Sequence, residues 1–132
     1  MDRRQARAAA MKLIYEWEMG GDGGEETVGG ILEIKPEEPE YDYTQRMVEG
    51  VRRDAEELDK RIGSYTSGWK LERLGRVDLA ILRLGAYELS LGELPPGVVI
   101  SEAVSLAHVY STDKAPSFIN GVLGSMARAE KE

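Results

Sequence analysis

The sequence contains no cysteine and only one histidine, His108, among its 132 residues. Disulfide bonds and thiolate metal sites are therefore excluded, and a zinc site would need an unusual set of carboxylates. No apolar run is long enough to cross a bilayer, and the N-terminus lacks a basic and apolar leader with a small-residue cleavage site. We therefore expect a soluble protein, and the lack of cysteine fits a cytoplasmic location.

Motifs for catalysis are missing as well. In the glycine-rich segment 20–30 the first glycines lead into Glu25 and Glu26, whereas a phosphate-binding loop needs a Lys and a Ser or Thr. Glu56 and Glu57 are neighbours in a helical pattern, so their side chains point about 100° apart and do not converge on one atom. His108 lies inside another helical pattern, where a lone histidine is more often packed or exposed than catalytic. The sequence predicts a protein that is not an enzyme, with no catalytic residue and no metal site.

Charge is distributed unevenly along the chain. The formal net charge is −7, so the average field of the protein repels phosphate. Between residues 3 and 12, however, all four charged residues are cations: Arg3, Arg4, Arg7 and Lys12. On a helix the three arginines follow one another along an arc beside the apolar face, which predicts an exposed basic strip. The strip fits nucleic-acid binding, and it also fits a solvated face whose arginine stems cover apolar surface.

Hydrophobic periodicity predicts an all-α, single-domain helical bundle of about six to seven helices spanning residues 1–132. No segment shows the sustained alternation of a β-strand. The stretch from Arg76 to Leu91 is apolar on nearly all sides and lies between Gly75 and Gly92, which predicts a buried central helix. Residues 20–40 are expected to form a flexible connection with one weak helical turn around 27–34, and residues 129–132 a frayed tail.

The other predicted helices are defined by caps and apolar stripes. Asp2 is a candidate N-cap of the first helix, and Asp42 with Gln45 has the spacing of a capping box for a helix that reaches about Tyr65. Ser67 is a candidate start of a short helix that ends at Gly75. Two further helices follow, one with Tyr110 turned toward the core and a last one that starts at Pro116.

Three stretches together resemble the NusB transcription antitermination family. They are RRQARAAAMKLIYEWE, WKLERLGRVDLAILRLGAYEL and PPGVVISEAVSLAHVYSTDKAPSFINGVLGSMA. In this order they span nearly the whole chain, apart from about residues 20–40. The resemblance implies an all-helical regulatory protein without a cofactor. It would bind single-stranded boxA-type RNA together with the ribosomal protein NusE, and help the transcription elongation complex read through terminators in ribosomal RNA operons.

The resemblance also implies site residues. Those matched to RNA binding are Arg3, Arg4, Arg7, Lys114, Ser117 and Phe118, and those matched to the protein partner are Tyr15, Glu72 and Asp78. Replacement of the three arginines is expected to weaken RNA binding with little effect on stability. The basic cluster is thinner than is usual in the family, because Gln5 stands where another basic residue is often found.

Several alternatives stay open at this point. Phe118 fits the apolar stripe of the last helix as well as an RNA-stacking platform. The chain also resembles the NusB-like domain attached to RNA cytosine methyltransferases, and a homodimeric protein-interaction module that hides its arginines is a third interpretation. The sequence does not decide the oligomeric state or the preferred RNA sequence.

Overall fold

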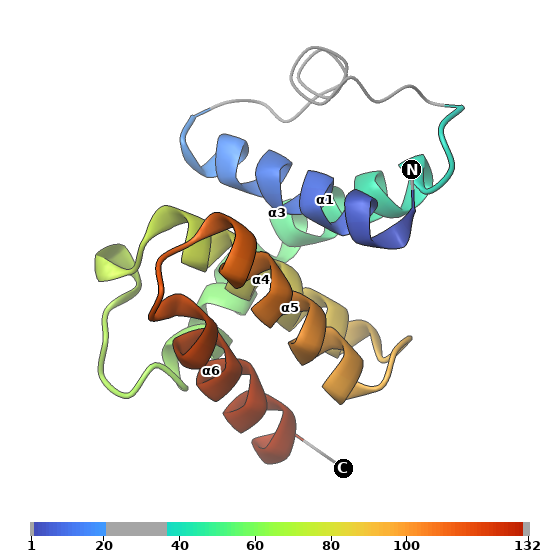
Figure 1. Ribbon diagram of the computed structural model, residues 1–132. Helices are drawn as coiled ribbons and strands as arrows, with labels where there is room; N and C mark the ends of the chain where they lie inside the picture. The colour runs from blue at the N-terminus through green and yellow to red at the C-terminus, as the bar shows by residue number, and fades with distance from the viewer. Residues whose placement is uncertain (1, 21–36, 131–132) are drawn as a thin grey trace.

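The computed structural model describes residues 2–20 and 37–130, and every regular element in these ranges is helical. The elements are α1 (Arg3–Glu18), α3 (Tyr41–Gly63), the 3-10 helix η1 (Leu71–Arg73), α4 (Arg76–Leu91), α5 (Pro96–Tyr110) and α6 (Ala115–Ala129), arranged as in Figure 1. The all-α prediction is confirmed, although the described ranges hold five α-helices rather than six or seven. The weak turn predicted around 27–34 lies outside them. No helix in the described ranges has both the length and the hydrophobicity to cross a membrane.

Helix α4 forms the centre of the bundle, as its sequence predicted. Every residue from Leu79 to Glu88 is buried. The helix contacts α1, α3, α5 and α6, which surround it in Figure 1. Gly75 precedes α4, and Gly92 ends it in the left-handed conformation with φ of 66°, which glycine adopts without a steric penalty.

Close approach of the helices depends on glycine at one contact of α3 with α4. Gly50 of α3 lies directly against the ring of Tyr87 in α4, and a side chain at position 50 would occupy the space of that ring. Gly63, at the end of the same helix, has open space around the position of a side chain. Glycine is therefore required by packing at position 50, and no such packing constraint exists at position 63.

Helix starts agree only in part with the predicted caps. Asp2 caps α1 and forms a reciprocal capping box with Gln5, as expected for Asp2. The predicted capping box of Asp42 is wrong, because α3 begins two residues earlier than that cap requires: its N-cap is Glu40, and Asp42 lies inside its first turn. A short helix does lie between Ser67 and Gly75, but the predicted start at Ser67 is wrong, because η1 covers only Leu71–Arg73. Ser67 has a φ of 53° and Gly68 one of 87°, and right-handed helix cannot form through left-handed backbone.

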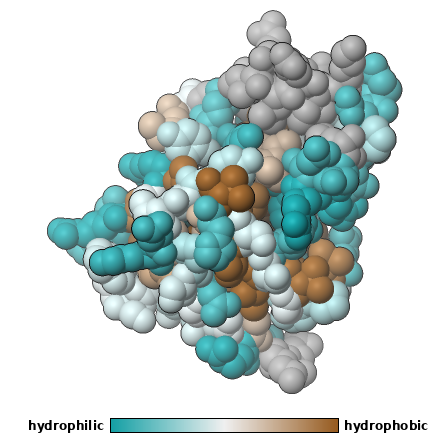
Figure 2. Space-filling view, viewed as in Figure 1, coloured by the Kyte–Doolittle hydropathy of each residue, from teal (hydrophilic) through white to brown (hydrophobic). Residues whose placement is uncertain are grey.

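The C-terminal part of α5 differs from the prediction in one side chain. Tyr110 was expected to face the core, but it is 38% exposed, and its neighbour Val109 is 70% exposed. The last turn of α5 therefore presents apolar side chains to solvent, and Figure 2 shows hydrophobic surface over α5 just below α1.

Helix α6 begins at Ala115, and Pro116 lies in its first turn. After the end of α6, Glu130 pairs with Arg61 of α3 at 2.5 Å.

Candidate nucleic-acid interface

The three arginines at the start of α1 occupy three different environments. Arg3 and Arg4 are exposed, whereas only 4% of Arg7 is accessible to solvent. The prediction of a continuous exposed strip is therefore wrong at Arg7. The reason is that α4 and α5 place carboxylates beneath this part of α1, and an arginine paired with carboxylates can be buried.

Arg3 joins the start of α1 to the start of α3. Its guanidinium pairs with the carboxylate of Glu40 and lies 4.0 Å from the ring centroid of Tyr43. The hydrogen bond from Arg3 lowers the pKa of Glu40 below its ordinary value. The side chain of Arg3 is still 45% exposed, so its remaining donors are accessible to an anion.

Arg4 points from α1 toward α5. Its guanidinium lies 3.0 Å from a carboxylate oxygen of Glu102, and 74% of the side chain is exposed. Because solvent surrounds most of Arg4, its pair with the mostly buried Glu102 contributes little to stability. Arg4 therefore remains chemically competent to exchange the carboxylate for a phosphate group.

Arg7 forms the buried base of the cluster. Two of its nitrogens lie 2.9 and 3.2 Å from the two carboxylate oxygens of Glu88 in α4, and a third lies 3.1 Å from Glu102 in α5. Burial opposes the charge of Arg7, but the hydrogen bond and charge of Glu88 outweigh it and raise the pKa of the guanidinium. Arg7 thus ties α1 to two neighbouring helices and holds Glu102 in place for Arg4.

The second predicted group lies at the start of α6. Lys114 and Ser117 are exposed, and Phe118 is partly buried and packed against the hydrophobic core. The packing fits the core role that the apolar stripe predicted for Phe118. Lys114 follows Tyr110 by four residues across the turn that joins α5 to α6.

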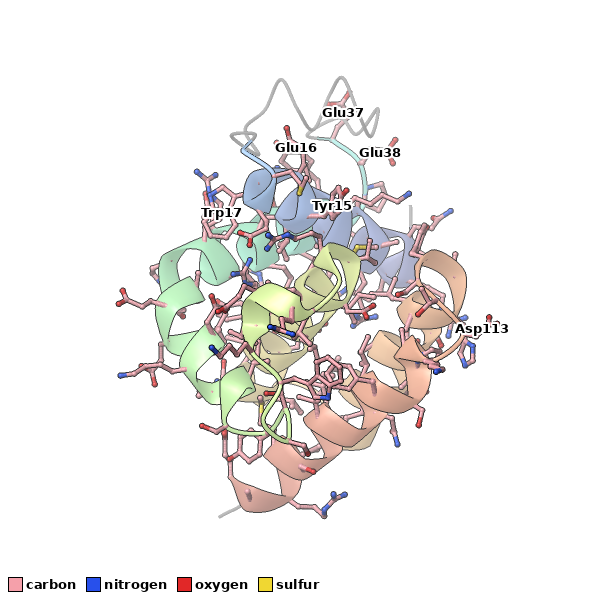
Figure 3. The ribbon with its side chains drawn as sticks, turned by 90° about the vertical axis from the view of Figure 1, so that its left-hand side faces the viewer. Tyr15, Glu16, Trp17, Glu37, Glu38 and Asp113 are labelled. Carbon is pink, nitrogen blue, oxygen red and sulfur yellow. The ribbon has the colours of Figure 1, made fainter. Side chains whose placement is uncertain are left out.

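The predicted partner residues lie on three elements. Tyr15 of α1 is partly buried against the core, and Figure 3 shows it beside Glu16 and Trp17 on the same helix. Glu72 is exposed on η1. Asp78, in the first turn of α4, accepts a hydrogen bond of 2.5 Å from the hydroxyl of Ser111. Asp78 therefore links the start of α4 to the turn after α5.

Three carboxylates of the site were not found from the sequence: Glu40, Glu88 and Glu102. A signal existed for Glu88, because a charged residue inside an otherwise apolar, buried helix must have a partner. The same reasoning applies to Arg83 of α4, which pairs with Asp59 of α3 at 2.8 Å and with Glu18 of α1 at 3.2 Å. Nothing in the periodicity indicates that Glu88 pairs with Arg7.

Comparison with known proteins gives consistent matches across the chain. The NusB family model matches residues 4–128. The transcription antitermination protein NusB of Acetivibrio thermocellus is 43% identical over 132 residues, which cover 98% of this chain and 91% of that protein. The protein of the same name from Clostridium botulinum (strain Loch Maree) is 37% identical over 140 residues, covering 96% of this chain and 99% of that protein.

A solved structure is similar over the same extent. A chain in the crystal structure of the antitermination factors NusB and NusE in complex with double-stranded RNA is 34% identical, with a TM-score of 0.85. The match covers 96% of this chain and 96% of that chain. The sequence matches and the structural match therefore identify the same family.

Proposed function

This chain belongs to the NusB family, and we propose that it is a transcription antitermination factor that binds single-stranded boxA-type RNA together with NusE. The observation that carries the proposal is the pair of exposed cations, Arg3 and Arg4, on the first turn of a helix that the family match includes almost entirely. The crystallised relative, which is in complex with NusE and double-stranded RNA, supports NusE and RNA as partners. In the proposed role the complex of this protein with NusE acts on the transcription elongation complex and promotes read-through in ribosomal RNA operons.

The electrostatics of the site support weak binding by the protein alone. Arg3 and Arg4 each already pair with a carboxylate, and the whole chain carries a formal charge of −7. Phosphate must therefore compete with Glu40 and Glu102 against an unfavourable average field. A second protein that adds cations beside the RNA would overcome this cost, which is why we include NusE in the functional unit.

The remaining predicted residues define the other parts of the proposed complex. Lys114, Ser117 and Phe118 extend the RNA surface to the start of α6. Tyr15, Glu72 and Asp78 are proposed to contact NusE. Because Asp78 is hydrogen-bonded to Ser111, contact with NusE at this position would also involve the turn between α5 and α6.

Binding of labelled boxA-type RNA and of a scrambled RNA, each measured with and without NusE over a series of salt concentrations, tests the proposal. We expect weak binding alone and tighter, sequence-selective binding by the pair, with affinity that falls as salt rises. Equal and salt-insensitive affinity with and without NusE would show that the proposal is wrong. A duplex of the same sequence, included as a further arm, separates recognition of single strands from recognition of shape.

A further inference from the structure

A mostly apolar groove separates α1 from α5 on the surface. Its volume is about 250 Å³. Its floor and walls include Ala8 of α1 and Ser105, Leu106, Val109 and Tyr110 of α5. Val109 and Tyr110 are exposed, and hydrophobic surface is visible over α5 on this face in Figure 2. Exposed apolar and aromatic side chains in a small groove are typical of a binding site.

Two cations of α1 flank the groove: Arg4 lines it, and Lys12 lies over the ring of Tyr110, which also lines it. Arg4 reaches Glu102 of α5. Beside Tyr110, the ammonium of Lys12 lies 4.9 Å from the ring centroid. The two cations are eight residues apart, which corresponds to about 12 Å along the helix axis. Ala8 lies between them, and its single methyl group keeps the middle of the groove open.

We propose that this groove is a single-nucleotide subsite for RNA. One base lies in the groove against Tyr110 and Val109, while Lys12 and Arg4 contact the phosphates on its two sides. The inference rests on the proposed RNA-binding function and adds Lys12, Val109 and Tyr110 to the residues that the family resemblance implies. Stacking on an exposed aromatic ring combined with backbone cations is the general mode by which single strands are held.

The charges of the groove favour RNA over a peptide helix or a second copy of the chain. No carboxylate of the described residues forms an ion pair with Lys12. The one carboxylate of the groove, that of Glu102, is balanced by both Arg4 and Arg7. A partner helix would need a long apolar stripe, whereas this groove is short and bounded by cations. An anionic ligand with one flat apolar group fits that arrangement.

The subsite is tested with Tyr110→Leu, Tyr110→Phe and Lys12→Gln, assayed with NusE on boxA-type RNA. We expect Tyr110→Leu to weaken binding about 5-fold to 100-fold, and Tyr110→Phe to bind nearly as wild type because the stacking face is retained. Lys12→Gln should weaken binding and lower the slope of log affinity against log salt by about 0.7. Lys60→Gln, at an exposed position of α3, is the control with the same charge change.

A scan of abasic positions in the RNA makes the test specific to one base. In wild type one abasic position should cost affinity, and the same position should cost nothing further in Tyr110→Leu, because the two changes remove one contact. As a readout that does not depend on variants, ultraviolet crosslinking of 4-thiouridine RNA to the wild-type protein should label the segment 105–110.

Three outcomes would overturn the subsite. If Tyr110→Leu and Lys12→Gln bind RNA as wild type while loss of Arg3 and Arg4 weakens binding, the RNA-binding function stands and the subsite is wrong. If Tyr110→Leu changes the oligomeric state and leaves RNA affinity unchanged, the groove is an interface between copies. If wild type with NusE binds no RNA, the proposed function and the subsite are both wrong.

Discussion

Arg7 and Glu88 form a buried, two-point ion pair between α1 and the central helix α4, with nitrogen–oxygen distances of 2.9 and 3.2 Å. Arg7 also shares the carboxylate of Glu102 with the exposed Arg4. One of three neighbouring arginines therefore stabilises the fold, while the other two remain on the surface. This division leads to different expectations for the three residues.

Arg7→Ala should destabilise the protein strongly. The change leaves the carboxylate of Glu88 buried without its partner, and loss of one member of a buried pair costs about 3 to 5 kcal/mol. Urea unfolding followed by circular dichroism measures the loss. Arg7→Ala combined with Glu88→Leu should recover part of it, since the unpaired carboxylate is then removed. A variant as stable as wild type would contradict the structural role of Arg7.

Arg3→Ala with Arg4→Ala should weaken RNA binding and leave the fold intact. Both side chains are exposed, so we expect the melting temperature to stay within about 4 °C of wild type. Loss of two phosphate contacts should lower the salt slope of RNA binding by about 1.4. Arg52→Ala with Lys60→Ala, two exposed cations of α3, is the matched control. An equal loss of affinity in the control would mean that net charge alone matters.

Glu102→Gln should increase RNA affinity. The carboxylate competes with phosphate for Arg4, whose side chain is 74% exposed, so the gain should be up to about fivefold. Arg7 also loses a partner in this variant, but its two-point pair with Glu88 is retained. Fluorescence anisotropy with boxA-type RNA in the presence of NusE measures it. Glu93→Gln is the control, because it removes the same charge from an exposed ion pair with Arg46 of α3. The interpretation fails if Glu93→Gln has the same effect, or if Glu102→Gln has none.

Gly50→Ala should destabilise the contact of α3 with α4. The added methyl group would meet the ring of Tyr87, and overpacking of a core contact costs about 1 to 3 kcal/mol. Gly63→Ala, where nothing lies near the new methyl group, should be neutral or stabilising by up to about 1 kcal/mol. Thermal unfolding of the two variants distinguishes packing from helix propensity, because propensity alone would make both more stable.

Short-range signals predicted much of this fold. The limits of α4 follow from an apolar stretch between two glycines, and the start of α1 follows from the cap by Asp2. These features depend on residues a few positions apart, so they are visible in the sequence. The predicted capping box at Asp42 failed because its spacing also occurs inside a helix, and the backbone at Glu40 determined where α3 begins.

The environment of the charged residues was decided only by tertiary packing. Arg3, Arg4 and Arg7 look alike in the sequence, but Arg7 meets a carboxylate 81 residues away and is buried. Tyr110 fits an inward stripe, yet it lies beside Lys12 of α1 at the edge of a groove. Helical periodicity indicates the face on which a side chain lies. Whether that face meets water, a carboxylate or another helix depends on where distant segments pack, and local sequence does not contain that information.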